Sequence, residues 1–149
     1  MTSKVFAYRF ERMLEVRRLK EEIAEREFAV ARNAAEAQEA RLAGLVSEQD
    51  AGKEALRGLK LSSIHMPSLQ QQEAYLLALE RRVRHASATL QELKRVEAER
   101  RGMLAEARQA VKVLEKHRER KLEAHAGERD REERKFLDEV AQNAARGES

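Results

Sequence analysis

The sequence predicts an all-α protein in which two long helices form an antiparallel coiled-coil hairpin. The 149 residues are 42% hydrophobic but only 4% aromatic and 38% charged, with six glycines and one proline, which is the composition of long helices. Apolar residues recur at alternating spacings of three and four, as in a heptad repeat. A single short break, which contains the proline, divides this pattern into two parts. Each part is therefore read as one helix.

The first helix is predicted over about residues 4–60. Seven of ten heptad positions in its second half are apolar, which gives the helix one stripe to bury. Gly52 and Gly58 lie near its end and are expected to loosen the coil there, because glycine weakens a helix interior. The ten positions are Phe28, Ala31, Ala35, Gln38, Leu42, Leu45, Gln49, Gly52, Leu56 and Leu59.

The turn is predicted at about residues 61–68, within the stretch LKLSSIHMPSL. Two serines and the proline interrupt the heptad pattern at this point. Ser68 followed by Gln71 matches a capping box, in which the two side chains satisfy free amides at a helix start. The second helix is therefore expected to begin near residue 69.

The second helix is predicted over about residues 69–145 and carries the stronger pattern. Ten of twelve successive heptad positions are apolar, the exceptions being Glu97 and Arg100. The twelve positions are Leu76, Leu79, Val83, Ala86, Leu90, Leu93, Glu97, Arg100, Leu104, Ala107, Val111 and Leu114.

The two stripes are expected to face each other, because each helix must bury its apolar side and the nearest stripe belongs to its neighbour. Residues 1–149 would then form a single hairpin domain with a thin core, and the N-terminus would lie beside the region near residue 120. The second helix would extend further and leave Phe136, Leu137 and Val140 uncovered. Such residues need another protein to cover them.

Basic residues gather at the end opposite the turn. Residues 1–20 and residues 108–121 each hold six basic and two acidic side chains, and the hairpin brings these segments together; we call them the basic collar. The same end has more apolar residues than one seam can cover. They are Val5, Phe6, Tyr8, Val16, Leu19, Ile23 and Val30.

Catalytic and metal chemistry find no support in the residue pattern. The chain has no cysteine, which excludes disulfides and thiolate sites. The glycines are isolated and form no phosphate-binding loop. The four histidines belong to no ligand motif and are read as exposed or turn residues; they are His65, His85, His117 and His125. We therefore expect no enzyme activity and no cofactor.

The sequence also bears on membrane insertion, nucleic-acid binding and self-association. No run approaches the roughly 18 apolar residues of a membrane span, so we expect a soluble cytoplasmic chain. The basic run HRERK at 117–121 is flanked by glutamates and lacks the aromatic residues on which bases stack, so no nucleic-acid partner is expected. A self-associating structural coiled coil remains an alternative.

The two ends of the chain resemble the FliJ family of flagellar export proteins and, more broadly, the FliJ- and YscO-like stalk proteins of type III secretion. The resemblance rests on YRFERMLEVRRLKEEIAEREFA at 8–29 and LEKHRERKLEAHAGERDREERKFLDEVA at 114–141. It implies a non-enzymatic hairpin, similar to the γ-subunit coiled coil of rotary ATP synthases, that acts as a central stalk. The same stalk in a virulence injectisome is the alternative.

The resemblance also implies partners. The terminal end would enter the ring of the hexameric export ATPase, the region near the turn would contact the cytoplasmic domain of the export gate, and export chaperones are further candidates. Association with the inner face of the cell membrane would be peripheral and only through these partners. The implied gate contacts are Leu45, Tyr75 and Leu79. The implied ATPase-ring contacts are Arg9, Phe10, Arg12, Leu14, Arg118, Phe136, Leu137, Asp138 and Glu139.

Overall fold

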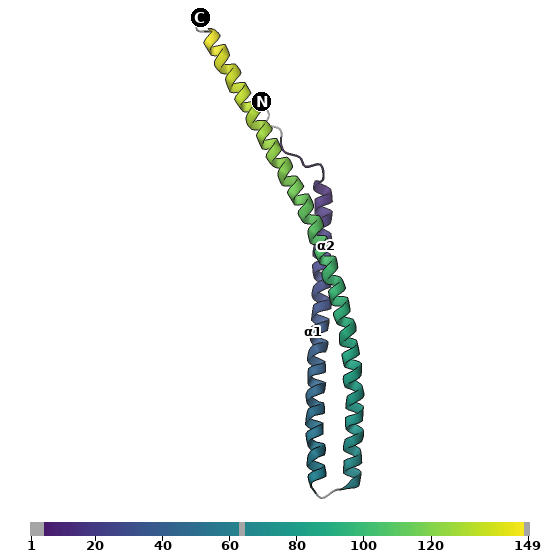
Figure 1. The fold of residues 1–149 in the computed structure, drawn as a ribbon. Coiled ribbons are helices and arrows are strands. Elements are labelled where there is room, and N and C mark those ends of the chain that lie inside the picture. The colour runs from purple at the N-terminus through teal and green to yellow at the C-terminus, as the bar shows by residue number, and fades with distance from the viewer. Residues whose placement is uncertain (1–4, 63–64, 148–149) are drawn as a thin grey trace. The chain divides into compact units, whose positions relative to one another are not determined.

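Two long helices make up the protein, as predicted. In the computed structural model, which describes residues 5–62 and 65–147, helix α1 spans Glu11–Leu61 and helix α2 spans Met66–Gly147. The helices run in opposite directions and pack against each other (Figure 1). The described residues contain no strand, so the all-α hairpin is confirmed.

The chain divides into two compact units, which are described separately. The terminal unit comprises residues 1–22 and 105–149, and the turn unit comprises residues 23–104. Each unit contains one stretch of α1 and one stretch of α2. Neither helix carries an apolar stretch long enough to cross a membrane among the residues described.

Helix α1 begins at Glu11, later than the predicted start near residue 4. Residues 5–10 precede the helix, and the Glu11 amide donates to the Tyr8 carbonyl oxygen at 3.2 Å. The side chains of this segment pack against α2, as described below, and these tertiary contacts replace helix formation. At the other end, the Ser62 amide donates to the Gly58 carbonyl oxygen at 3.1 Å and closes the last turn.

Helix α2 begins at Met66, before the predicted start at residue 69. His65 takes the capping position, because its carbonyl oxygen accepts the Leu69 amide at 3.1 Å and its Nδ1 lies 3.0 Å from Ser68 Oγ. Pro67 fits the first turn, where its missing N–H leaves no helical bond unmade. Ser68 thus lies inside the helix, and the capping box predicted for it is wrong. Residues 63–64 of the expected turn lie outside the described residues.

The seam of the turn unit follows the predicted heptads. Every predicted position from Phe28 to Leu59 and from Leu76 to Leu104 is buried or half-buried. The two polar exceptions on α2 are half-buried as well, and Arg100 reaches across the seam to pair with Glu27 at 3.1 Å. The buried apolar side chains of this unit are Ala31, Ala35, Leu79, Ala86, Leu90 and Leu104.

Polar groups within this seam hydrogen-bond across it. The Gln38 side-chain amide donates to the Ala86 carbonyl oxygen at 3.1 Å, and the Gln72 amide donates to the Gly52 carbonyl oxygen at the same distance. A half-buried amide would otherwise lose its water without compensation. These two hydrogen bonds therefore offset the cost of placing polar side chains in the seam.

Gly52 brings the helices together instead of loosening them, which corrects the sequence-based expectation. It is buried, and a Cβ placed on it would lie 2.7 Å from Leu76 Cδ2. Real Cβ atoms do not approach another carbon that closely. The absent side chain therefore makes the room that Leu76 occupies.

Candidate partner-binding surfaces

The N-terminal segment of the terminal unit is fixed to α2 by an aromatic cluster. The Tyr8 hydroxyl lies 2.6 Å from His117 Nδ1 and 3.4 Å from the Leu114 carbonyl oxygen. The rings of Tyr8 and Phe10 meet edge-on at 5.9 Å, and Phe10 lies 5.8 Å from the His117 ring. The Arg9 guanidinium lies over the Phe10 ring, with its central carbon 5.5 Å from the ring centroid. Phe10 is consequently half-buried.

Phe6 makes a second contact of the same kind. Its ring packs edge-on against His125 at 5.6 Å, and the Arg118 guanidinium lies over it at 5.6 Å. Arg118 also pairs with Glu11 at 2.9 Å. A shallow hollow follows this segment, lined by residues 5–10 and by His117, Lys121 and His125 of α2.

His117 and His125 therefore pack against aromatic rings. The prediction of exposed histidines is wrong for this pair, which is half-buried. No group of three or more metal-ligating side chains occurs among residues 5–62 and 65–147.

The basic collar is held together by two reciprocal ion pairs. Arg118 of α2 pairs with Glu11 of α1, and Arg18 of α1 pairs with Glu115 of α2 at 3.3 Å. Each basic segment contains only two acidic residues, and each uses one of them to bind an arginine of the other. The pairs thus offset the repulsion between two segments of like charge.

Apolar residues of α1 remain exposed in both units. Val16 and Leu19 of the terminal unit are exposed, and so are Ile23 and Val30 of the turn unit. Phe6 and Tyr8, which the sequence grouped with them, are instead half-buried against α2. Arg9 and Arg12 of the terminal unit are exposed as well.

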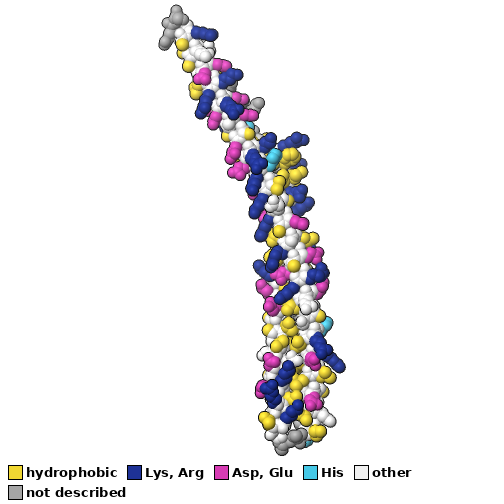
Figure 2. All heavy atoms as spheres, in the orientation of Figure 1, with side chains coloured by type: hydrophobic (Ala, Val, Ile, Leu, Met, Phe, Trp, Pro, Cys, Tyr) yellow, Lys and Arg dark blue, Asp and Glu magenta, His cyan; other side chains and the backbone are white. Residues whose placement is uncertain are grey.

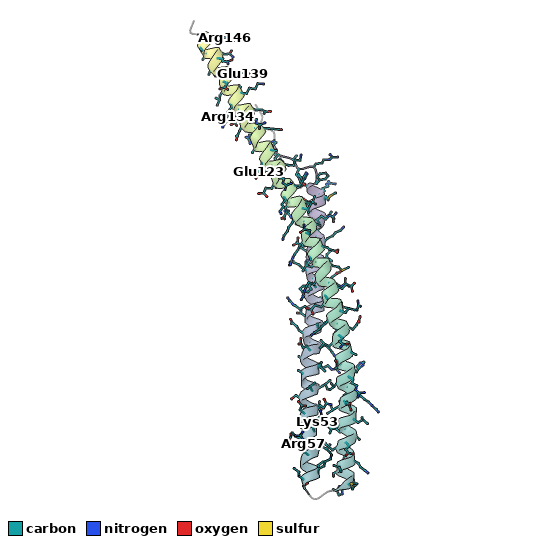
Figure 3. The ribbon with its side chains drawn as sticks, viewed as in Figure 1. Lys53, Arg57, Glu123, Arg134, Glu139 and Arg146 are labelled. Carbon is teal, nitrogen blue, oxygen red and sulfur yellow. The ribbon has the colours of Figure 1, made fainter. Side chains whose placement is uncertain are left out.

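The last part of α2 is exposed along its described length. Every residue from 128 to 147 is exposed, including Phe136 at 51%, Leu137 at 63% and Val140. Figure 2 shows basic and acidic side chains interspersed along this stretch. Figure 3 shows Arg134, Glu139 and Arg146 projecting from it. The exposure of Phe136, Leu137 and Val140 was predicted and is confirmed.

Tyr75 occupies a defined position in the turn unit. Its hydroxyl donates to Glu48 Oε1 of α1 at 2.5 Å, while the side chain stays 41% exposed. This hydrogen bond raises the pKa of Tyr75 above its usual value, and desolvation and the Glu48 charge act in the same direction, whereas Arg82 opposes them. Tyr75 therefore packs at the end of the coil and presents a surface as well.

The implied contact residues fall into exposed and buried sets. Arg9, Arg12 and the four residues 136–139 are exposed, and Phe10 and Arg118 are half-buried in the N-terminal cluster. Among residues 5–62 and 65–147, Leu14 and Leu79 are the two large side chains that are fully buried. Leu14 and Leu79 therefore stabilise the seam and present no surface of their own, while Leu45 is half-buried beside it.

Sequence reasoning missed the partners that hold these residues. The contacts of Tyr8 with His117 and of Tyr75 with Glu48 join residues far apart in the chain. The only available signal was the antiparallel pairing, which places residue 8 near the region of residue 120. That pairing does not resolve which side chains meet.

The fold defines a class: a helical hairpin with exposed apolar side chains on its described part. The comparisons specify the family. The family model of the flagellar FliJ protein matches residues 6–149, and the chain therefore belongs to the FliJ family and is a flagellar export protein. Searches among curated proteins and among solved structures gave no match.

Proposed function

We propose that this protein is the central stalk of the flagellar type III export ATPase complex. Its terminal unit inserts into the hexameric ATPase ring, and the region around Tyr75 contacts the cytoplasmic domain of the export gate. The protein couples the two without catalysing a reaction itself. It reaches the inner face of the cell membrane only through these partners, and export chaperones are further candidate partners.

The observation that carries the proposal is the uncovered stretch of α2 at residues 128–147. A helix this polar gains little from exposing Phe136, Leu137 and Val140, whereas burying them in a partner is favourable. A large apolar side chain contributes roughly 1.5 to 3 kcal/mol on full burial. Phe136 and Leu137 are 51% and 63% exposed, so a partner can still gain about 1 kcal/mol from each.

The charges of the basic collar contribute differently. Exposed ion pairs are each worth about 0 to 1 kcal/mol and weaken with salt. Long-range attraction between a positive end and an acidic ring interior instead accelerates encounter. We therefore assign the affinity chiefly to the apolar residues of α2 and the association rate chiefly to Arg9 and Arg12.

Surface plasmon resonance with the purified export ATPase, across a salt series, tests this assignment. Phe136→Ala with Leu137→Ala should weaken binding by about 2 kcal/mol, roughly thirtyfold, and reduce stimulation of ATP hydrolysis at every salt concentration. Arg9→Ala with Arg12→Ala should slow association mainly at low salt. Phe10 is less suitable as a target, because it packs against Tyr8 and His117 and its loss would disturb the fold.

Leu61→Ala is the matched control, because Leu61 is an exposed apolar residue at the far end of α1. It should leave ATPase binding unchanged. Wild-type affinity in the Phe136 and Leu137 double variant would contradict insertion of this segment. Concentration-dependent dimerisation that is lost in the same variant would instead favour a self-associating coil.

A further inference from the structure

Tyr75 of the turn unit makes contacts with α1 although it lies outside the heptad positions of the seam. Gly52, Gln72, Tyr75, Leu76 and Glu48 form a continuous set of contacts between α1 and α2. The Gln72 amide binds the Gly52 carbonyl oxygen, and Leu76 occupies the space beside Gly52. The Tyr75 ring borders the same space, with its Cε1 3.6 Å from the position that a Gly52 Cβ would take.

The hydroxyl end of the Tyr75 side chain meets α1 at a second point, one helical turn away from Gly52. Glu48 precedes Gly52 by four residues, which places both on one face of α1. The Tyr75 hydroxyl reaches Glu48 Oε1 at 2.5 Å. The Tyr75 ring therefore borders Gly52 and its hydroxyl binds Glu48. Tyr75 nevertheless remains 41% exposed.

We propose that Glu48 and Gly52 hold Tyr75 in a fixed orientation, so that its exposed surface is ready for the cytoplasmic domain of the export gate. The inference rests on the proposed function, which places the gate contact at Tyr75. Glu48 is then a positioning residue: it binds Tyr75, which contacts the partner, but does not contact the partner itself.

The physical basis is the entropy of the exposed ring. A side chain that is free before binding loses rotamer freedom when a partner immobilises it, and this loss weakens the complex. Glu48 removes that loss in advance by holding the ring in the unbound protein. Tyrosine suits such a contact because it combines a large surface with only two torsions.

Binding of the purified gate domain to variants of the full chain tests the inference. Tyr75→Ala should weaken binding most, since the ring itself is lost. Glu48→Ala should weaken it about 2- to 10-fold, as expected for one side chain released from its orientation. Glu48→Gln should bind like the wild type, because its amide oxygen still accepts the tyrosine hydrogen bond. Glu54→Ala is the matched control, since Glu54 is an exposed glutamate of α1 that pairs with Arg57 instead.

A second measurement follows the hydrogen bond between Tyr75 and Glu48 in the unbound protein. Tyr8 and Tyr75 are the only tyrosines, so a Tyr8→Phe background reports Tyr75 alone in an absorbance titration. The hydrogen bond to Glu48 holds the pKa of Tyr75 above its usual value. Glu48→Ala should lower that pKa toward the usual value, whereas Glu54→Ala should leave it unchanged.

The outcomes separate the two proposals. If Tyr75→Ala binds the gate domain like the wild type, the gate contact at Tyr75 fails and this inference fails with it. If Tyr75→Ala weakens binding while Glu48→Ala changes neither affinity nor titration, the positioning role alone is overturned. Equal weakening by Glu48→Gln and Glu48→Ala would also overturn it, since charge rather than orientation would then matter.

Discussion

Small side chains determine how closely α1 and α2 approach in the turn unit. Ala31, Ala35 and Ala86 are buried there, and Gly52 is the extreme case. Alanine leaves little volume between the backbones, so the helices come close without large residues to separate them. The stability of this seam consequently depends on shape at single positions as well as on apolar area.

Replacing Gly52 by alanine should lower the stability of the protein. The new Cβ would meet Leu76 Cδ2 at 2.7 Å, and displacing a packed side chain costs roughly 1 to 3 kcal/mol. The gain in helix propensity, about 1 kcal/mol, offsets only part of this cost. Urea unfolding followed by circular dichroism measures the net effect.

Gly44→Ala is the control for this substitution. A Cβ at Gly44 meets nothing within 4 Å, so alanine should stabilise the helix by about 0.5 to 1 kcal/mol. Equal stabilisation by both variants would show that Gly52 makes no close contact.

At the scale of the helices, the seam and the uncovered segment should respond differently to the same truncation. Leu90 is 8% exposed, and Leu90→Ala should cost roughly 2 to 3 kcal/mol, the low end for core truncations, because a two-helix seam is narrow. Leu137→Ala should change the free energy of unfolding by less than about 0.5 kcal/mol. Chemical denaturation of the two variants compares them directly, and equal losses would contradict the seam assignment.

The uncovered part of α2 should be dispensable for folding. Residues 128–147 make no buried contact, and an isolated helix of this length is only marginally stable. A chain ending at Gly127 should keep the melting temperature of the full protein while losing helical signal in proportion to the residues removed. A large drop in melting temperature would mean that this segment supports the fold.

For the whole molecule, the modest net charge of +3 conceals an uneven distribution. The two segments of the basic collar repel each other, and the reciprocal pairs Glu11–Arg118 and Arg18–Glu115 oppose that repulsion. These side chains are all more than a third exposed, so each pair contributes no more than about 1 kcal/mol. Salt should therefore weaken the pairs and the repulsion together.

Neutralising Glu11 and Glu115 should strengthen the net repulsion between the two basic segments of the collar. Glu11→Gln with Glu115→Gln should lower the melting temperature at low salt, and the difference from the wild type should shrink as salt screens the remaining positive charges. Glu54→Gln, which removes a pair within α1, should have little effect at either salt concentration. A salt-independent loss in the double variant would point to hydrogen bonding in place of charge.

The sequence predicts the seam well because helical periodicity is a local property. A residue such as Leu90 is assigned to the seam from its neighbours three and four positions away, and the structure buries it. The uncovered end of α2 follows from the unequal lengths of the two predicted helices. Both inferences need only the direction of pairing.

Features that depend on individual contacts were not predictable in the same way. The start of α1 at Glu11 is set by the packing of Phe6 and Tyr8 on α2, which local propensity does not encode. From the sequence, Gly52 is predicted only to weaken the helix, because the sequence does not show that Leu76 lies opposite it. The Tyr75–Glu48 bond requires the register of the two helices to within one turn.

Gln38 favours one of several possible alignments of the two helices. Heptad stripes repeat every seven residues, so sliding α1 along α2 by one repeat would again match apolar positions with apolar positions. The Gln38 amide reaches the Ala86 carbonyl oxygen beside a small side chain. A shift of one heptad would place Leu79 or Leu93 at that position, whose larger side chains crowd the backbone carbonyl. A single polar residue thereby disfavours the shifted alignments, and the seam loses some apolar burial at that position. Movement of one helix past the other along the axis is thus opposed in discrete steps of one heptad.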